Sequence, residues 1–291
     1  MKGILMAGGI GKRLYPLTII TSKQLLPIYD KPMIYYSLSL LLIAGVRDIL
    51  IISDKTSIIS YEKLFSDGSS LGIKISYKIQ ESPKGIADGL IVAKDFIADE
   101  SVMFVLGDNF IYGSDLQEVL KNAIKNNNGA TIFGYTVKNP IEYGVAFVND
   151  LGVIVSIEEK PINSNSNLAI PGIYIYNSDA VKMALDLKPS SRGELEITDL
   201  NKKYLSQSKL KLIKLGRGIV WLDTGNPTML NIASNYVEMV QNRQGNYIGC
   251  LEEIVWRMGY ITTQSLKIKA EHMLDTEYGS YLLSLVKEKL S

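Results

Sequence analysis

Histidine and cysteine are nearly absent from this chain of 291 residues, which holds one of each, His272 and Cys250. A lone cysteine excludes an internal disulfide framework and a cysteine metal cluster built from one chain, and it suits a reducing compartment. A lone histidine, far in sequence from every motif below, leaves no material for histidine triads, HExxH zinc sites or Cys–His pairs. The remaining groups are carboxylates, lysine, arginine and backbone donors, which are the groups that phosphate transfer uses.

An excess of charge of either sign is also missing. The 31 basic and 30 acidic side chains leave a formal net charge of +1, so we expect no nucleic-acid partner. The uncharged apolar stretch between Lys31 and Arg47 is shorter than the ~20 residues that a membrane-spanning helix needs. Glycines, then Lys12 and Arg13, interrupt the apolar N-terminus, so we expect it not to act as a signal peptide. We expect a soluble, cytoplasmic protein without a membrane partner.

Short β-branched runs alternate with helical stretches over the first 140 residues. The expected strands are Gly3–Met6, Asp48–Ser53, Ile73–Ile79, Val102–Leu106 and Thr131–Tyr135. The expected helices are Met33–Ala44, Ser57–Leu64, Ile86–Ile97 and Leu116–Lys125. In the third helix, apolar residues recur at helical spacing and indicate a core stripe. Such alternation predicts an α/β fold with a doubly wound, mostly parallel mixed sheet and helices on both faces.

The rhythm changes after residue 140. Gly144–Val148 and Val153–Glu158 flank a turn and predict a hairpin. Further strands are expected at Gly172–Tyr176, Leu210–Leu215 and Ile219–Leu222, and helices from Thr228 to Lys289. Because no linker is visible, we expect a single domain over residues 1–291. It would have an α/β core of about 1–227 and a helical portion of about 228–291 that serves oligomerisation or regulation.

A glycine-rich turn, Leu5-Met6-Ala7-Gly8-Gly9-Ile10-Gly11-Lys12-Arg13-Leu14, follows the first expected strand directly. Glycines let backbone N–H groups close on an anion, and the adjacent cations neutralise phosphate charge. A P-loop is excluded because Met6 holds its first glycine position and Arg13 its hydroxyl position. A dinucleotide fingerprint is excluded because Leu14 holds its third glycine position. Taken alone, the segment also fits a plain tight turn.

Two apolar strands are followed by, or end in, an aspartate, in Leu106-Gly107-Asp108-Asn109 and in Trp221-Leu222-Asp223-Thr224-Gly225. Open α/β sheets bind ligands at the carboxyl ends of their strands. A single aspartate at the end of a strand could also be a capping residue with no ligand. Two aspartates could share one Mg²⁺, which favours one or two carboxylates together with phosphate oxygens and water.

Two lysine-containing segments could either bind a phosphate group or be solvated surface. Lys23, in Ser22-Lys23-Gln24-Leu25-Leu26-Pro27, could form a second phosphate clamp or could be simply solvated. Ile157-Glu158-Glu159-Lys160-Pro161 ends a further strand and also fits a solvated charge run before a proline turn. In Glu142-Tyr143-Gly144, the glycine would let backbone approach a sugar.

Together these segments resemble one family, the glucose-1-phosphate thymidylyltransferases among the sugar nucleotidyltransferases. Residues 8–14 are similar to its GGxGTRL signature, and residues 22–36 match its SKQLLPVYDKPMIYY block almost letter for letter. The other blocks follow in family order over essentially the whole chain: Leu106–Asn109, Glu142–Val145, Glu158–Pro161, Arg192–Asp199 and Trp221–Gly225.

The resemblance implies a Rossmann-like nucleotidyltransferase fold and a Mg²⁺-dependent transfer from dTTP to glucose 1-phosphate. The products would be pyrophosphate and dTDP-glucose, for deoxysugar and surface polysaccharide biosynthesis. It implies that Asp108 and Asp223 bind the metal and that Arg13, Lys23 and Lys160 are catalytic. The implied nucleotide-binding residues are Leu5, Gly8, Gly9, Gly11, Arg13, Lys23, Gln24, Gln80 and Gly85. The implied sugar-phosphate residues are Asn109, Tyr143, Gly144, Glu159, Lys160 and Ile170. It also implies a homotetramer, often with a second site for an inhibitory sugar nucleotide.

The chain departs from the family pattern in the glycine-rich turn and in residues 85–89, where the family's GLAQA becomes Gly-Ile-Ala-Asp-Gly. Lys12 replaces a threonine and adds a cation beside the triphosphate, and Asp88 replaces a glutamine, which bears on nucleoside selectivity. Transfer from UTP or to another sugar phosphate is therefore an alternative. A non-catalytic sugar-nucleotide sensor would lack a metal aspartate or Lys160, and both are present. The fingerprint argument above disfavours an oxidoreductase.

Overall fold

The computed structural model describes residues 1–9 and 11–290, so Ile10 of the predicted glycine-rich turn lies outside it. The strands are β1 (Lys2–Met6), β2 (Pro27–Ile28), β3 (Lys31–Pro32), β4 (Asp48–Ser53), β5 (Lys74–Ile79), β6 (Val102–Leu106), β7 (Asn109–Tyr112), β8 (Ala130–Thr136), β9 (Gly144–Val148), β10 (Ile154–Glu159), β11 (Leu168–Ala169), β12 (Ile173–Tyr176), β13 (Leu210–Lys214) and β14 (Val220–Asp223). The α-helices are α1 (Met33–Ile43), α2 (Ile58–Phe65), α3 (Asp88–Val92), α4 (Lys94–Ile97), α5 (Leu116–Lys125), α6 (Asp179–Leu185), α7 (Ile197–Ser206), α8 (Pro227–Gln244), α9 (Leu251–Arg257), α10 (Thr263–Glu271) and α11 (Glu277–Leu290). Three 3-10 turns are η1 (Lys12–Leu14), η2 (Lys23–Leu25) and η3 (Ser69–Leu71).

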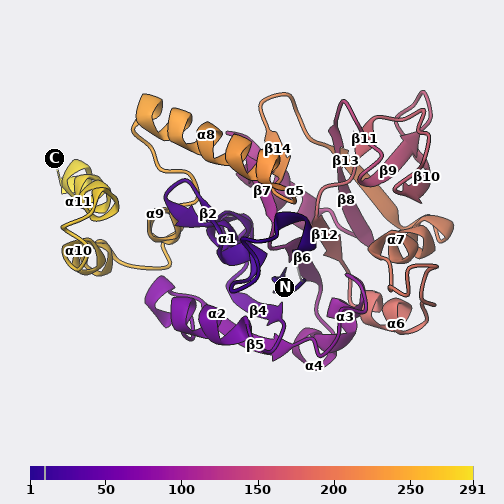
Figure 1. The fold of residues 1–291 in the computed structure, drawn as a ribbon, viewed down its shortest axis with the longest axis horizontal. Coiled ribbons are helices and arrows are strands. Elements are labelled where there is room, and N and C mark those ends of the chain that lie inside the picture. Colours follow the sequence, from indigo (N-terminus) through magenta and orange to yellow (C-terminus); the bar gives the residue numbers. More distant parts are fainter. Residues whose placement is uncertain (10, 291) are drawn as a thin grey trace.

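A mixed sheet forms the centre of the molecule, with strand order β10-β9-β11-β8-β12-β6-β1-β4-β5 and with β13 beside β8 (Figure 1). Strands β6, β1, β4 and β5 run parallel, and β12 joins them antiparallel to β6. This arrangement confirms the predicted α/β fold class. Because β1 lies between β6 and β4, the segments that leave the carboxyl ends of these strands meet at one edge.

The hydrophobic core occupies both faces of the sheet. Helices α1 and α5 cover one face, and α3, α6 and α7 cover the other. Helix α1 is apolar on nearly every side because it is enclosed, with the sheet on one side and α9 on another. The buried parallel strands are continuous apolar runs for the same reason, since both of their faces are covered.

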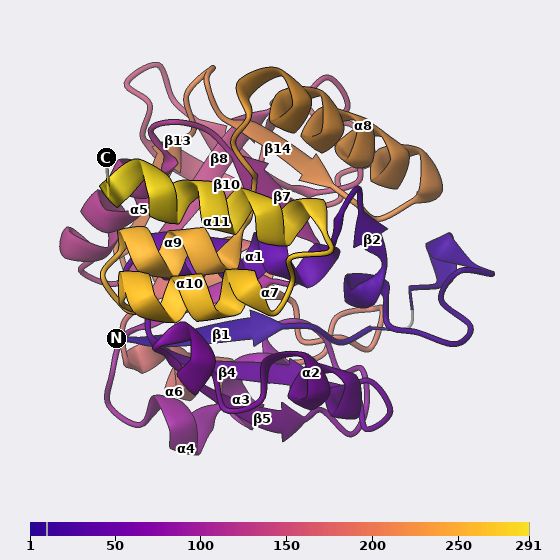
Figure 2. The ribbon, with the colours of Figure 1, turned by 90° about the vertical axis from the view of Figure 1, so that its left-hand side faces the viewer.

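The C-terminal helices extend the sheet domain at one end. Helix α8 packs against β2 and β14, whereas α9, α10 and α11 form a cluster with a core of its own (Figure 2). Figure 1 shows α10 and α11 at the opposite end of the molecule from β9 and β10. The helical prediction beyond Thr228 is confirmed, and α8 begins at Pro227. The predicted division into a core and a helical portion stays a prediction.

Several elements differ from those expected. The stretch 86–97 forms two short helices, α3 and α4, because Ala93 has a non-helical conformation. Of its predicted core stripe, Leu90, Ala93 and Ile97 are buried and Ile86 is partly buried. Helices α6 and α7 and strand β7 were not predicted from the sequence. Strand β14 pairs with β7 in a separate two-stranded sheet. In the part of the chain that the structure describes, no helix is long and apolar enough to cross a membrane.

Candidate active site

The two predicted metal-binding aspartates lie side by side because β7 and β14 pair. Asp108 follows β6 and Gly107, and the register of the small sheet places Asp223 opposite Asn109. The hydroxyl of Thr224 donates a hydrogen bond to the backbone carbonyl of Asp108 at 2.9 Å, which joins the two segments. One aspartate therefore comes from the central sheet and the other from a strand more than 100 residues later.

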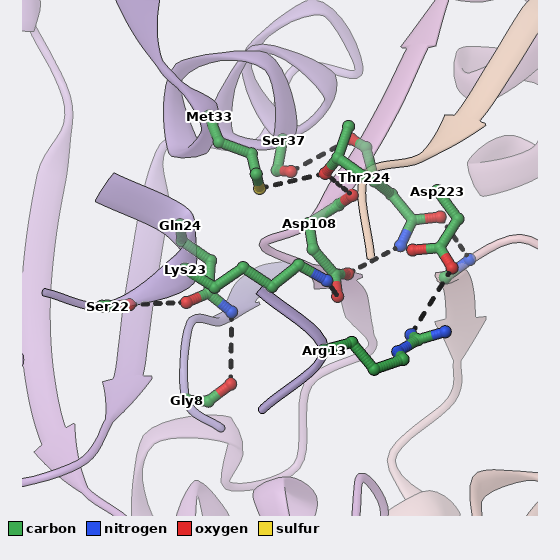
Figure 3. A network of polar contacts seen from close by, with 12 residues as sticks. Gly8, Arg13, Ser22, Lys23, Gln24, Met33, Ser37, Asp108, Asp223 and Thr224 are labelled. Atoms are coloured by element: carbon green, nitrogen blue, oxygen red, sulfur yellow. Dashed lines mark hydrogen bonds and ion pairs between the residues drawn. The ribbon is translucent and has the colours of Figure 1, made fainter. Parts of the chain in front are cut away.

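Two cations approach these carboxylates. The Nζ of Lys23, in η2, donates a hydrogen bond of 2.6 Å to Oδ2 of Asp108, and the lysine is buried. The guanidinium of Arg13, in η1, lies 3.9 Å from Oδ2 of Asp223 and 3.3 Å from a carboxylate oxygen of Glu142. Figure 3 shows both cations directed at the aspartate pair. The site thus alternates positive and negative groups.

The two aspartates differ in their affinity for a proton. Burial alone would raise the pKa of Asp108, but the charge and hydrogen bond of Lys23 outweigh it and lower that pKa. Burial and the neighbouring charge of Asp108 raise the pKa of Asp223 to about 6, against a smaller opposing influence of Lys23 and Arg13. The uncompensated negative charge of the site is therefore concentrated at Asp223, which makes the pair receptive to a cation.

A glycine-rich turn borders the aspartate pair. Gly9 and Gly11 have φ angles of 112° and 61°, which favour glycine. The turn lines a hollow of about 310 Å³ together with both cations and Asp108. A Cβ at Gly225 would lie 2.5 Å from an Arg13 nitrogen, so a side chain there would displace the guanidinium. Backbone N–H groups and cations around a hollow suit a polyphosphate.

The predicted base-binding residues line a neighbouring pocket of about 190 Å³. Gln80 follows β5 at the same sheet edge, and Gln24 lies in η2. The carboxamide of Gln24 donates to the carbonyl of Gly8 at 3.2 Å and accepts from Ser22 at 2.6 Å. Gly85 has a φ of 104°, and a Cβ there would lie 2.5 Å from the carbonyl oxygen of Leu195.

The predicted sugar-side residues gather around Glu159, the last residue of β10. Its carboxylate accepts a 2.5 Å hydrogen bond from Thr198, and Lys160 Nζ lies 3.9 Å away. The Ile170 amide donates to the Gly144 carbonyl at 2.8 Å, so both residues lie beside the carboxylate. The structure therefore brings a carboxylate, an exposed lysine and a glycine backbone together. Such a mixture can bind hydroxyl groups and a phosphate.

The remaining predicted residues are held more tightly than a free ligand-binding group would be. The carboxamide of Asn109 donates to Asp108 and accepts from Trp221 and from the backbone of Gly172. The ring of Tyr143 packs on Trp221 with centroids 4.9 Å apart. Leu5 lies inside β1 with its side chain in the core. The binding roles of these three residues stay predictions.

The sequence analysis gave no individual role to three residues that the structure places here. Arg192 donates hydrogen bonds to Glu159 at 3.4 Å and to Glu196 at 2.8 Å. Thr198 holds the other oxygen of Glu159, and Glu142 pairs with Arg13. Arg192 and Thr198 belong to one block of the family resemblance, which was the only signal for them.

The donor set of the aspartate pair fits a divalent cation. Two neighbouring carboxylates, of which Asp108 lines the hollow, leave most coordination positions for phosphate oxygens and water, as Mg²⁺ prefers. Within residues 1–9 and 11–290, no group of three or more histidine, cysteine or carboxylate side chains could enclose a metal. A metal at this site would therefore be shared between protein and substrate.

Comparisons with known proteins agree with this site. A model of the nucleotidyl transferase family matches residues 2–239, a span that includes both aspartates. A glucose-1-phosphate thymidylyltransferase of Neisseria meningitidis is 50% identical over 288 residues, covering 99% of this chain and 100% of the relative. One of Xanthomonas campestris is 47% identical, covering 98% of this chain and 97% of the relative.

A solved structure extends the agreement to three dimensions. It is described as a glucose-1-phosphate thymidylyltransferase of Bacillus anthracis in complex with sucrose. It has a TM-score of 0.76 at 36% identity and covers 81% of this chain and 94% of that one. The chain belongs to the glucose-1-phosphate thymidylyltransferases within the nucleotidyl transferase family. Enzymes of this family generally use a divalent metal ion.

Proposed function

We propose that this protein transfers a deoxythymidylyl group from dTTP to α-D-glucose 1-phosphate and releases pyrophosphate and dTDP-glucose, with Mg²⁺ as its metal. The relatives' names supply the two substrates. The observation that carries the proposal is the meeting of Asp108 and Asp223 with Lys23 beside a glycine-rich turn. That arrangement supplies metal ligands and phosphate neutralisation at one place.

The reaction is an in-line displacement at the α-phosphorus of the nucleotide. An oxygen of the sugar phosphate forms the new bond to phosphorus, and the bond to the bridging α–β oxygen breaks, so that pyrophosphate leaves with the electron pair. The sugar phosphate loses its second proton with a pKa of about 6 and is already anionic near neutral pH. The protein therefore needs no general base.

The remaining task is to hold two anions together and to neutralise charge on the leaving group. Arg13 and the backbone of the glycine-rich turn would bind the triphosphate, and Lys23 would act on its phosphates while holding Asp108. Mg²⁺ bound by the two aspartates would supply charge neutralisation between the reacting phosphates. On the opposite side, Lys160 would bind the sugar phosphate and Glu159 the sugar hydroxyls.

Pyrophosphate release tests the proposal. Purified protein with glucose 1-phosphate and Mg²⁺ should release pyrophosphate fastest with dTTP, when each nucleoside triphosphate is supplied in turn. Omitting the sugar phosphate, or adding EDTA, should abolish release. A preference for UTP, or the same rate without glucose 1-phosphate, would contradict the assignment.

These substrates also favour a cytoplasmic location. Light scattering of the purified protein would test the proposed homotetramer.

A further inference from the structure

An acidic side chain that does not line the base pocket contacts Gln80, which does, and the chemistry above has no use for it. Asp88 is the first residue of α3 and is buried. Its carboxylate accepts a 2.7 Å hydrogen bond from Nε2 of Gln80, and the same nitrogen lies 3.3 Å from the backbone carbonyl oxygen of Gly85. A carboxylate is therefore in contact with the side chain that is expected to read the base.

The contact fixes which end of the carboxamide faces the pocket. A carboxamide has one accepting and one donating end, and its two orientations occupy nearly the same volume. An ionised carboxylate and a backbone carbonyl can only accept hydrogen bonds. Both groups around Gln80 therefore require its NH₂ group, and a turned carboxamide would set oxygen against oxygen at two places.

The oxygen of Gln80 consequently points toward the glycine-rich turn. Its Oε1 lies 3.8 Å from the position that a Cβ of Gly8 would occupy. Gly8 and Gln80 line the same pocket of about 190 Å³. A base that enters this pocket therefore meets a hydrogen-bond acceptor at Gln80. The carboxamide cannot turn to present a donor instead.

We propose that Asp88 is a positioning residue that selects thymine and uracil over cytosine by locking the Gln80 carboxamide with its oxygen toward the base. The proposal rests on the nucleotide-transfer function proposed above. Thymine and uracil carry an N–H at position 3, which an acceptor can bind. Cytosine carries a lone pair there, which the locked oxygen repels. An unpaired polar group in a closed site gives stronger discrimination than a missing methyl group.

Asp88→Asn tests the lock with little change of shape. Because the side chain of asparagine can donate as well as accept, only the longer, 3.3 Å contact with the Gly85 carbonyl would then oppose a turn of Gln80 that offers its NH₂ group to cytosine. We expect the preference for dTTP over dCTP to fall by roughly 10-fold or more in this variant, the size of one satisfied or unsatisfied buried hydrogen bond. The preference for dTTP over dUTP should stay unchanged, since the two bases present the same hydrogen-bonding edge.

The measurement is the dissociation constant of each nucleotide, by titration calorimetry with Mg²⁺ and without sugar phosphate. Asp95→Asn is the matched control, because it removes a largely exposed carboxylate from the neighbouring helix α4 and should change neither ratio. Asp88→Asn should also have no further effect on the dTTP-to-dCTP ratio in a Gln80→Ala background. This result would show that Asp88 acts through Gln80.

The outcomes separate the lock from the proposed function. An unchanged dTTP-to-dCTP ratio in Asp88→Asn, or an equal fall with and without Gln80, would overturn the lock and leave the transferase assignment intact. Weaker binding of all three nucleotides by one factor would show that Asp88 only supports the fold, which also overturns the lock. Wild-type protein that selects dTTP in binding but releases no pyrophosphate would contradict the transfer reaction alone.

Discussion

The nucleotide side and the sugar side of the site each rest on a lysine beside a carboxylate, but the two pairs are built differently. The side chain of Lys23 is 9% exposed and donates to Asp108 at 2.6 Å. The side chain of Lys160 is 48% exposed and lies 3.9 Å from Glu159. Glu159 is held by Thr198 and Arg192 instead. Lys23 is therefore a fixed, buried part of the site, whereas Lys160 is exposed and can bind an incoming anion.

The difference indicates how each side contributes to the reaction. A buried, hydrogen-bonded pair keeps its geometry when substrate arrives, so it can stabilise charge that develops only during the reaction. An exposed cation with a weak partner gains its main interaction when a phosphate binds, in the ground state and in the transition state alike. We therefore expect losses on the nucleotide side to lower kcat and losses on the sugar side to raise KM.

The largest expected effect comes from removing a charge of the aspartate pair. Asp108→Asn and Asp223→Asn should each lower kcat by at least ~100-fold, the loss that follows removal of one pre-organised stabilising group. Steady-state pyrophosphate release at saturating substrates measures this. Asp150→Asn, in the exposed turn between β9 and β10, should retain full activity. Near-normal turnover in either site variant would remove these residues from the metal site.

A smaller and differently distributed effect is expected at Lys160. Lys160→Ala should raise KM for glucose 1-phosphate by roughly 10- to 100-fold, the value of a charge-assisted hydrogen bond. KM for dTTP should change much less. Varying each substrate at a saturating concentration of the other separates the two constants, and Lys138→Ala at an exposed position is the matched control. Equal effects on both KM values would mean that the two sides are assigned in reverse or that Lys160 is structural.

The sequence identified the central sheet because its strands are continuous apolar runs. It also located Asp108 and Asp223, since each follows or ends such a run. It did not reveal β7, because β7 is four residues long and begins directly after Asp108. Without β7 there was no way to see that β14 pairs outside the central sheet and so carries Asp223 to Asp108.

The partners of the site residues were less accessible from sequence than the residues themselves. Thr198 and Arg192 reach Glu159 across more than 30 residues, and only their block in the family resemblance signalled them. Asp88 was noticed as a departure from the family pattern, but its hydrogen bond to Gln80 depends on how the start of α3 lies beside the residue that follows β5. Local patterns predict elements, whereas contacts between loops require the folded backbone.

The two aspartates should also differ in their effect on stability in the absence of metal. Asp223 has a pKa of about 6 in the folded protein, above the ordinary value of about 3.9 that the unfolded chain shows. The folded state therefore binds this proton more tightly than the unfolded chain does. At pH 8, where the carboxylate is charged in both states, the charge lowers the free energy of unfolding, and this destabilisation disappears as pH falls from 6 toward 4. Asp223→Asn should therefore stabilise the metal-free protein at pH 8 by about 1–3 kcal/mol.

Urea unfolding in EDTA at pH 8 and at pH 5 measures this difference, which should shrink at the lower pH. Asp108→Asn is the contrasting variant. Because Lys23 lowers the pKa of Asp108, that carboxylate stabilises the folded state at pH 8, and its removal should destabilise the protein. Destabilisation by both substitutions at pH 8 would show that Lys23 and Arg13 stabilise the two carboxylates more equally than the geometry indicates.

The last and smallest effect concerns the acid limb of the pH profile, which we expect to belong to the substrate. The kcat/KM for glucose 1-phosphate should fall as pH drops through about 6, because the sugar phosphate loses its nucleophilic dianion there. Asp223 has a pKa of about 6 in the metal-free protein, so its protonation could imitate this fall. A sugar 1-phosphate analogue with a more acidic phosphate distinguishes the two, because only a substrate-derived limb moves to lower pH with the analogue.

His272 lies exposed at the end of α10, in the C-terminal helical cluster, so His272→Gln should leave the limb in place. A limb that stays fixed when the substrate pKa changes, or that disappears with His272, would show that the protein supplies the titrating group after all.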